Sequence, residues 1–391
     1  MASPAPQPSA APAPTPSGPA GPRPVPLMDP KRVYGEWAPA AEATLVDILR
    51  SGVYVKGPHV AGLEEELARL VGTKHAVAVD SGTEALTLVL RALFTELPPE
   101  RREVVVPTFT FVATAGSVVN AGGRPVFADV DEHTMNLCPS SVERLVGPRT
   151  AAVVPVHLFG SPAPMDVLQQ VVAAHGPVTL VEDAAQAIHA RWQGRRAGSL
   201  GRAATFSFYP SKNLGAAGDG GAVTTDDASM AELVASLRDH GMRKKLYSHE
   251  RVGTNARMDE MQAAVLRAKM PRIDAWTAAR RAVAARYDAA FAGTPVRPQR
   301  ILPGAEACYH LYTVRVPRRD EVKAALERAG IATGIYYPVP LHRQACFAGW
   351  APSPCPVADR LSAEVLSLPM FPGLQPEEQQ RVIDQVLAAC R

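Results

Sequence analysis

Short valine-rich apolar runs that alternate with helical patterns are the feature that most limits how this chain folds. Such runs occur within 75–93, 103–123, 124–131, 150–160 and 177–190, and each is bounded by Gly, Pro or Asp. Runs of this kind predict strands buried on both faces, because a strand with one wet face alternates polar and apolar residues. Strands that alternate with helices predict an α/β fold, with a largely parallel sheet covered by helices on both sides.

The pattern changes in the last third of the chain. Helical periodicity runs from Met258 to Phe291 and is broken at Pro271, which predicts a kinked or split helix there. We place a domain boundary at this break. The sequence therefore predicts a large α/β domain over 27–272 and a smaller α+β domain over 273–391.

The first 26 residues are rich in proline and alanine, with ten of the 37 prolines and almost no large apolar side chains. Such a segment buries too little surface to offset its ordering entropy, so it predicts a disordered tail over 1–26. Its one charge is Arg23 and no continuous apolar stretch follows, which argues against a signal peptide. No later run is apolar for long enough to cross a bilayer, so we expect no membrane association.

Charge and cysteine usage exclude several classes of function. The formal net charge is +3 and the basic residues are scattered among acidic ones, which argues against nucleic acid as a partner. The cysteines lack CxxC spacing and predict reduced thiols of a cytoplasmic protein, with neither disulfides nor a metal site. These five residues are Cys138, Cys308, Cys346, Cys355 and Cys390.

Two polar stretches fall where strands are expected to end. Ligands of open α/β sheets collect at the carboxyl ends of strands, near the free N–H groups of helix N-termini. Ser81, Gly82 and Thr83 lie at such a strand-to-helix turn and are suited to hold a phosphate, although for this motif alone an ordinary helix cap followed by Glu84 is the favoured explanation. Asp183 ends the apolar run VTLVE and is either a functional carboxylate or a solvated cap.

Lys212 lies between an apolar stretch and a glycine-rich run in FSFYPSKNLGAAGDGG. A buried ammonium is costly, and burial lowers its pKa toward a nucleophilic amine. A solvent-facing loop lysine is the alternative. Together with Asp183 and the turn at Gly82, Lys212 describes a pyridoxal 5′-phosphate (PLP) site: an amine for the aldehyde, a carboxylate for the pyridine nitrogen and a phosphate cradle.

Six motifs in register give the chain a family resemblance. It resembles the DegT/DnrJ/EryC1/StrS family of nucleotide-sugar aminotransferases from about residue 27 to the C-terminus. The resemblance implies an aspartate aminotransferase-like fold of type I, with a mixed, mostly parallel seven-stranded sheet. It also implies a homodimer whose active sites lie at the interface. The motifs are GVYVKGPHV, DSGTEAL, PTFTFVATA, VEDAAQAIHA, TFSFYPSKNLGAAGDGGAV and GTNARMDEMQAAVL.

The resemblance implies roles for individual residues around the cofactor. Lys212 is implied as the Schiff-base lysine and Asp183 as the partner of the pyridinium nitrogen. Gln186 in DAAQ is implied to reach the phenolic oxygen. Phe111 in TFVAT takes the position of the ring that stacks on the pyridine, with a core phenylalanine as the alternative.

The phosphate is implied to be shared between subunits. Ser207 in FSF, together with Gly82 and Thr83, looks like the phosphate-binding set of one chain. Asn255 in TNAR resembles the asparagine that reaches the same phosphate from the neighbouring subunit. A lone monomer would then have an incomplete site.

The implied reaction is a two-stage transfer with ping-pong kinetics. Glutamate gives its amino group and leaves pyridoxamine 5′-phosphate (PMP) in the site, and Lys212 moves the proton as general base and acid. The keto group of a nucleotide-linked sugar then accepts the amine. The segments YYPVPLHRQACF and LSLPMFPGL resemble members that aminate C3, while amination at C4 is the alternative.

Candidate substrate residues carry weaker signals. Tyr337 and His342 are predicted to line the sugar or diphosphate pocket, with a proline-braced structural loop as the alternative. His157 in PVHLFG is either pocket lining or a satisfied core histidine. The basic triplet at 243–245 is either an anion contact or an ordinary solvated surface.

Three rival functions can be weighed against single residues. Dehydrases of the same family carry histidine where Lys212 stands, so this lysine argues against them. A non-catalytic regulator of the same fold would be expected to have lost Lys212 or Asp183, and both are present. A Rossmann-type oxidoreductase, suggested by GAAGDGG, lacks the required strand–turn–helix placement and the acidic ribose partner.

Overall fold

The computed structural model describes residues 23–242, 247–350 and 353–391. Most of the predicted tail and the whole basic triplet at 243–245 lie outside these described residues. Within the described ranges, no helix is both long enough and apolar enough to cross a membrane.

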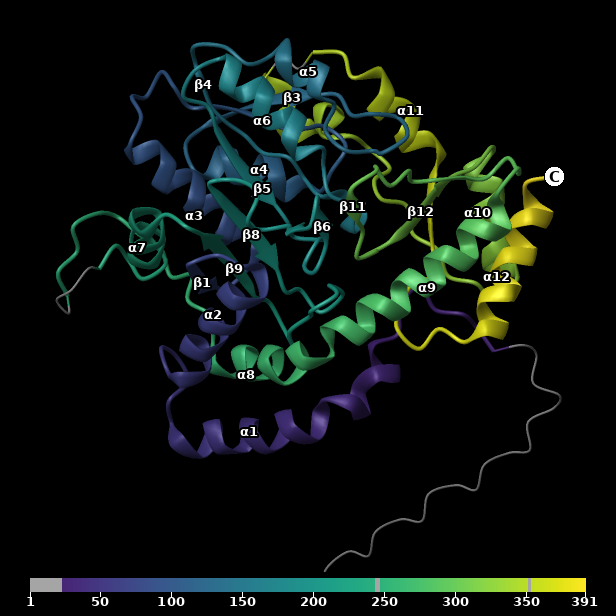
Figure 1. The fold of residues 1–391 in the computed structure, drawn as a ribbon, viewed down its shortest axis with the longest axis horizontal. Coiled ribbons are helices and arrows are strands. Elements are labelled where there is room, and N and C mark those ends of the chain that lie inside the picture. The colour runs from purple at the N-terminus through teal and green to yellow at the C-terminus, as the bar shows by residue number, and fades with distance from the viewer. Residues whose placement is uncertain (1–22, 243–246, 351–352) are drawn as a thin grey trace, which may run out of the picture.

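A seven-stranded sheet forms the centre of the larger part of the molecule (Figure 1). β9 runs antiparallel to both of its neighbours, and the other pairs are parallel. This arrangement confirms the predicted mixed, mostly parallel sheet of a fold type I enzyme. In spatial order the strands are β1 (His75–Val79), β9 (Gly221–Thr225), β8 (Ala203–Ser207), β5 (Thr179–Asp183), β4 (Thr150–Val153), β2 (Glu103–Pro107) and β3 (Arg124–Ala128).

Helices cover both faces of this sheet, as the continuous apolar runs require. In β1, Val77 and Val79 pack on one face in a cluster with α3, whereas Ala78 packs on the other face with α2. Consecutive residues of β2 divide in the same way between the two faces. The helices around the sheet are α2 (Pro58–Val71), α3 (Gly82–Thr95), α4 (Val112–Asn120), α5 (Pro139–Glu143), α6 (Met165–Ala174), α7 (Ala228–Leu237) and α8 (Glu260–Lys269).

The predicted break at Pro271 is confirmed, because a 3-10 turn over Met270–Arg272 separates α8 from α9 (Ile273–Phe291). Figure 1 shows α9 leading from the large sheet toward the C-terminal elements. There the antiparallel strands β10 (Arg297–Pro298), β12 (Tyr312–Arg315) and β13 (Val365–Leu368) form a small sheet. The accompanying helices are α10 (Arg319–Arg328), α11 (Pro356–Glu364) and α12 (Pro376–Ala389).

The chain before α1 (Ala38–Ser51) packs on this C-terminal part rather than on the large sheet. Val25 is fully buried, its N–H donates to Gly330 O at 2.8 Å, and it pairs with Ile331. Arg32 forms an ion pair with Glu378 at 2.6 Å. Val25 lies between two prolines, and both of its backbone polar groups are used, because its C=O also accepts from Ala332 N at 2.9 Å. Residue 25, which belongs to the predicted tail over 1–26, therefore packs on the C-terminal part as a short bridge.

Candidate active site

A cavity of about 630 Å³ lies where the predicted site residues meet. The carboxyl ends of β1, β5 and β8 face the same edge of the sheet, because these three strands run in the same direction. The loops that follow them bring separate sequence motifs to one place. The cavity lining includes Gly82, Thr83, Phe111, Asp183, Gln186, Ser207, Lys212 and Tyr337.

The N-terminus of α3 lies against the end of β8. Ser81 caps the helix, and its Oγ accepts a hydrogen bond from Glu84 N at 3.1 Å. The approach is so close that a Cβ added at Gly82 would lie 2.6 Å from Ser207 Cβ. The first-turn N–H groups of the helix have no acceptor within the helix, and they face anions favourably. Gly82, Thr83 and Ser207 therefore form a cradle suited to a phosphate.

Asp183 is the last residue of β5 and is buried, with 8% of its surface exposed. Its Oδ2 accepts a hydrogen bond from Thr114 Oγ1 at 2.8 Å, and its Oδ1 accepts from Ala185 N at 3.2 Å. Thr114 lies on α4, three residues after Phe111. The carboxylate is thus held in one orientation at the wall of the cavity.

Lys212 is carried by the tight loop that follows β8. The loop is closed by hydrogen bonds from Lys212 N to Tyr209 O at 2.8 Å and from Ala216 N to Phe208 O at 2.7 Å. Burial lowers the pKa of the Lys212 amine to about 8, while the negative charge of Asp183 opposes this shift. In the part of the chain that the structure describes, its Nζ has no hydrogen-bond or ion-pair partner. The amine is therefore available for reaction.

Gln186 and Tyr337 form a second side of the cavity. Gln186 Oε1 accepts from Phe159 N at 2.7 Å, and its Nε2 donates to Tyr337 Oη at 3.1 Å. Burial raises the pKa of Tyr337, so its hydroxyl stays protonated at neutral pH. The Phe111 ring lies 6.2 Å from the Tyr337 ring and is 54% exposed. This exposure rules out the alternative of a core phenylalanine.

Asn255 is the cofactor candidate that the structure does not bring to this cavity. It is exposed in the single chain, where its backbone bridges to Asp239. A residue that serves the neighbouring subunit would have to be exposed in this way, so the geometry is compatible with the predicted shared site.

His157 and His342 are not among the described residues that line the cavity, and their contact with substrate stays a prediction. His157 is fully buried, with its Nε2 2.9 Å from Glu182 Oε2 and its Nδ1 accepting from Ala163 N at 3.0 Å. His342 is also buried, with its Nδ1 2.7 Å from Thr108 Oγ1. The burial of His157 fits the core histidine that the sequence left open as an alternative. His342 lies in the turn Leu341–Arg343 that follows Pro340, which fits its alternative of a proline-braced structural loop.

Two residues at this site were missed by sequence reasoning. Thr114 orients Asp183, and its only signal was its place in the TFVAT motif. His310 lines the cavity, and its Nδ1 lies 3.3 Å from Asn213 Oδ1. Burial and the nearby Lys212 lower the pKa of His310 well below its ordinary value, so it is neutral. Its signal was a single histidine in CYHLY, which is too common a pattern to stand out.

These residues fit PLP. The cofactor needs an amine for its aldehyde, a carboxylate for its pyridine nitrogen and N–H groups for its phosphate, and one cavity offers all three. The cradle depends on close backbone approach: a Cβ at Gly82 would lie 2.6 Å from Ser207 Cβ, and one at Gly221 would lie 2.4 Å from Ser81 O.

Fold and cavity together define a PLP-dependent aminotransferase of fold type I. The model of the DegT/DnrJ/EryC1/StrS aminotransferase family matches residues 38–387, and the chain belongs to this family. The structure also resembles the solved structure of Streptomyces venezuelae DesV in complex with a ketimine intermediate. That match has a TM-score of 0.90 and 44% identity, and covers 94% of this chain and 99% of the other.

Three curated relatives match the chain over almost its whole length. A dTDP-3-amino-3,4,6-trideoxy-alpha-D-glucose transaminase of Streptomyces venezuelae is 45% identical, over 93% of this chain and 95% of the relative. A UDP-N-acetyl-3-dehydro-alpha-D-glucosamine 3-aminotransferase of Acidithiobacillus ferrooxidans is 43% identical, over 92% and 96%. A protein of Geobacillus stearothermophilus named a pleiotropic regulatory protein is 42% identical, over 93% and 97%.

Proposed function

We propose that this chain transfers an amino group from glutamate to the C3 keto group of a nucleotide-linked sugar. The observation that carries the proposal is the unpartnered amine of Lys212, which lines the same cavity as Asp183. Two relatives at 45% and 43% identity are named for amination at C3, which favours C3 over C4. PLP, when bound, supplies an aldehyde that bonds to amines and a ring that withdraws electrons from the α-carbon of the donor.

The chain's own side chains divide the work of holding the cofactor. Lys212 would hold it through Nζ, and Asp183 would keep its pyridine nitrogen protonated. Gly82, Thr83 and Ser207 bind the phosphate through the cradle at the start of α3. Thr114 acts through Asp183, because its hydroxyl at 2.8 Å fixes the direction of the carboxylate.

Lys212 also moves the proton. As a free amine, Lys212 would act as the general base that takes the proton from the donor's α-carbon, and then as the general acid that gives this proton up. A pKa near 8 suits both the uptake and the release of a proton, because such an amine is readily protonated and deprotonated at neutral pH. The phenol of Tyr337 and the neutral imidazole of His310 line the same cavity.

Gln186 and Phe111 are the residues that we propose to contact the pyridine ring of PLP. Gln186 is anchored through its Oε1, which leaves Nε2 as a donor toward Tyr337 and the phenolic oxygen of the cofactor. Phe111 presents a half-exposed ring at the cavity, in the position proposed to stack on the pyridine.

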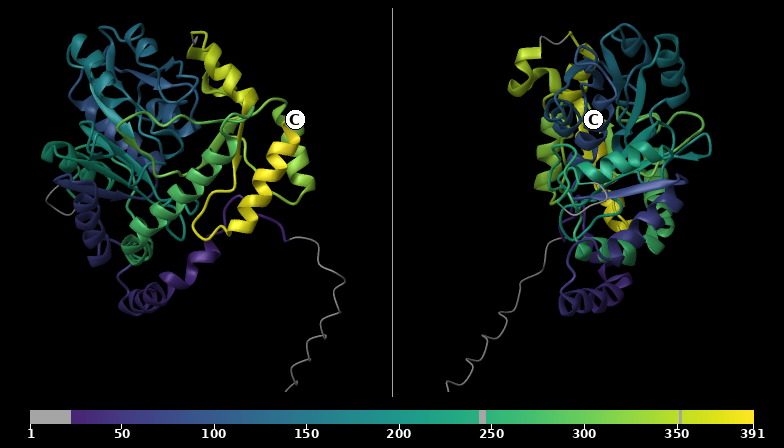
Figure 2. Two further views of the ribbon diagram at one scale, coloured as in Figure 1. Left: turned by 45° about the vertical axis from the view of Figure 1, so that its right-hand side comes forward. Right: turned by 90° about the vertical axis from the view of Figure 1, so that its left-hand side faces the viewer.

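We also propose a homodimer with shared sites. Exposed apolar side chains cluster on α1 and the loop that follows it, and each is between 43% and 56% exposed. Figure 2 shows from two sides that α1 lies at the outer edge of the molecule, where a second copy would cover it. The cluster consists of Val46, Leu49, Val53, Tyr54 and Val55.

The proposed activity is tested with dTDP-, UDP- and GDP-linked 3-keto and 4-keto sugars, each with glutamate. We expect 2-oxoglutarate and an amino sugar whose new nitrogen is located at C3 by NMR. Nitrogen at C4 would overturn the regiochemistry alone. No 2-oxoglutarate with any sugar would favour a regulatory protein, the function named for the Geobacillus relative.

The role of Lys212 is tested by borohydride reduction of the PLP-loaded protein and peptide mass analysis. We expect the reduced adduct on Lys212, and expect Lys212→Ala to abolish turnover while the fold is kept. The matched control is Lys31→Ala, because Lys31 is exposed and lies on the 3-10 helix η1 (Pro30–Glu36), away from the cavity lining. An adduct on another lysine would remove Lys212 from its proposed role.

A further inference from the structure

A second, much smaller cavity shares Lys212 with the active-site cavity. Its volume is about 50 Å³, and its wall holds three basic side chains, Lys212, Lys269 and Arg280, together with Trp37 and Trp276. A water molecule needs roughly 10–15 Å³ of such space. The second cavity therefore takes an ion of halide size with one or two waters, but not a sugar or a nucleotide.

Arg280 is a buried cation that forms no ion pair with the residues that the structure describes. It is 4% exposed, and its Nη1 donates to the carbonyl oxygens of Tyr309, His310 and Met370 at 3.1, 3.3 and 3.0 Å. Its Nε is buried and has no hydrogen-bond partner among the described residues. Burial lowers the pKa of Arg280 to about 10, so the group is still charged at neutral pH. Carbonyl dipoles alone oppose this charge.

Lys269 adds a second uncompensated charge. Its Nζ donates to Gly215 O at 2.6 Å and lies 4.2 Å from the centre of the Trp37 ring, but it forms no ion pair with any described residue. Burial lowers the pKa of Lys269 to about 8. The acidic residue in the cavity wall is Asp29, and its carboxylate is 3.3 Å from Arg32.

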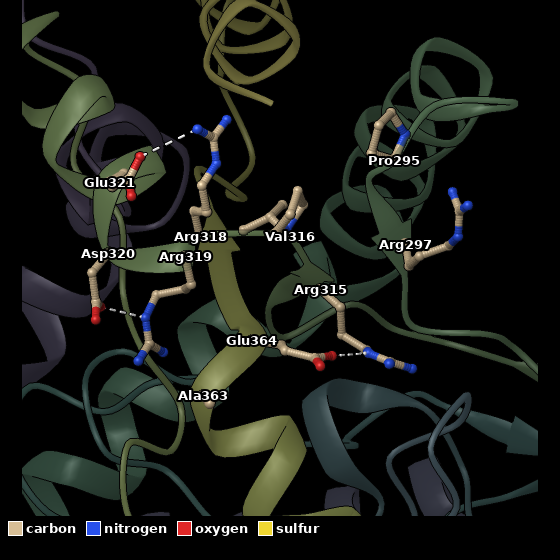
Figure 3. Close-up of a pocket in the computed structure, with 11 residues that line it drawn as sticks. Pro295, Arg297, Arg315, Val316, Arg318, Arg319, Asp320, Glu321, Ala363 and Glu364 are labelled. Carbon is tan, nitrogen blue, oxygen red and sulfur yellow. Dashed lines mark hydrogen bonds and ion pairs between the residues drawn. The ribbon is translucent and has the colours of Figure 1, made fainter. Parts of the chain in front are cut away.

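Another basic hollow of the molecule shows arginines whose charges are balanced by nearby carboxylates. A hollow of about 650 Å³ beside α10 is lined by several arginines (Figure 3). There Arg315, Arg318 and Arg319 each lie close to a carboxylate, at 2.7, 3.5 and 2.6 Å. The second cavity departs from this pattern, because Arg280 is buried and neither it nor Lys269 has a carboxylate partner among the described residues.

We propose that the second cavity binds one small monovalent inorganic anion of halide size, chloride in the cell, between Lys269 and Arg280. Buried charges are costly unless they are paired, and a bound anion supplies the missing pair for both groups. The site is independent of the aminotransferase proposal, because it needs neither PLP nor sugar. An anion there also favours the ammonium form of Lys212, so it would slow the addition of Lys212 to aldehydes.

Trp37 and Trp276 make the site measurable in solution. Bromide quenches tryptophan fluorescence, so we titrate the full-length holoenzyme with potassium bromide, holding ionic strength constant with potassium gluconate. We expect a saturable component of quenching that chloride relieves by competition. Lys269→Met should weaken bromide binding at least about 10-fold by removing one of the two charges. Lys323→Met, on the exposed face of α10, is the matched control and should leave binding unchanged.

If Lys269→Met does not fold, X-ray diffraction tests the anion site in the wild-type protein. Crystals of the wild-type holoenzyme grown in bromide should show an anomalous peak between Lys269 Nζ and the Arg280 guanidinium. Quenching that rises linearly with bromide and ignores chloride, or a cavity without a peak, would overturn the anion site. Neither result bears on the transfer of the amino group, which is measured separately through 2-oxoglutarate.

Discussion

At the scale of single residues, Lys212 sets a pH dependence that can be measured without sugar substrate. An exposed lysine has a pKa of about 10.4, so roughly one in 2,500 is neutral at pH 7. A pKa of about 8 makes roughly a tenth of Lys212 neutral at that pH. Because the neutral amine reacts, we expect the rate of PLP uptake by the apoprotein to rise with pH and level off above about 8. Stopped-flow absorbance measures this rate, and a rise that continues to pH 10 would contradict the lowered pKa.

Asp183→Asn should shift this profile in a defined direction. The negative charge of Asp183 raises the pKa of Lys212, so removing it lowers that pKa further. We expect the midpoint of PLP uptake to move down by about one pH unit, since a nearby opposite charge shifts a pKa by one to three units. Turnover with glutamate should be lost, because the amide no longer holds the pyridine nitrogen protonated. An unchanged midpoint would mean that Asp183 and Lys212 are not coupled.

Residue types alone indicated the groups that we propose to do chemistry, but not their neighbours. Lys212 and Asp183 stood out because a buried amine and a carboxylate at a strand end are costly without a purpose. His157 and His342 carried weaker signals, and each contacts a partner in the fold, Glu182 for His157 and Thr108 for His342. The partner of His157 is Glu182, next to Asp183 in sequence but pointing to the opposite side of β5. A single sequence does not reveal that pairing, because it depends on which loop returns to the strand.

At the scale of elements, Glu182 ties β5 to the turn before β8. Besides contacting His157, its oxygens accept from the backbone N–H groups of Gly198, Leu200 and Gly201 at 2.7, 2.6 and 2.7 Å. Glu182→Gln turns one acceptor into a donor that faces these N–H groups. We expect a loss of about 1–3 kcal/mol in the free energy of unfolding, the cost of one unsatisfied buried group.

Urea unfolding monitored by circular dichroism measures the Glu182→Gln effect. Glu327→Gln is the control, because Glu327 is exposed and pairs with Lys323 at 3.4 Å across one helical turn. Exposed pairs of this kind contribute well under about 1 kcal/mol. Equal stability of the two variants would show that the turn does not depend on the carboxylate.

Gly82→Ala tests the approach of α3 to β8. The new Cβ would lie 2.6 Å from Ser207 Cβ and 3.0 Å from its Cα, so the helix N-terminus must move away from the strand. We expect PLP affinity to fall at least about 10-fold, because the phosphate cradle opens. Gly116→Ala in α4 is the control: no atom lies within 4 Å of its Cβ, and alanine should stabilise the helix by about 0.5–1 kcal/mol. Equal PLP affinity in both variants would contradict the cradle.

Helices and strands could be predicted from the sequence where a single local rule determines them. Strands buried on both faces and the break at Pro271 followed from apolar runs and from proline geometry. The segment before α1 was not predictable, because its proline content indicates disorder while Val25 finds a place beside Ile331. That contact joins residues more than 300 positions apart in sequence, and composition carries no information about it.

At the scale of the whole molecule, the exposed apolar cluster on α1 and the exposed Asn255 argue for the same assembly. Side chains such as Leu49, at 56% exposure, and Tyr54, at 48%, are costly to leave in water. A second copy that covers them removes this cost. We expect a dimer by light scattering, and expect Leu49→Glu to shift the protein toward monomer and lower its activity together. A dimer unaffected by Leu49→Glu would place the interface elsewhere.

Mixing two inactive variants tests whether each site is built from both chains. Lys212→Ala removes the amine of its own site, and Asn255→Ala removes the side chain proposed to reach the neighbour's phosphate. A heterodimer of the two has one site with both groups intact and one site with neither. Random exchange makes about half of the dimers mixed, so activity should recover to about a quarter of wild type. Each variant mixed with itself is the control and should stay inactive. If Asn255 instead served its own chain, every site in the mixture would lack one group and no activity would return.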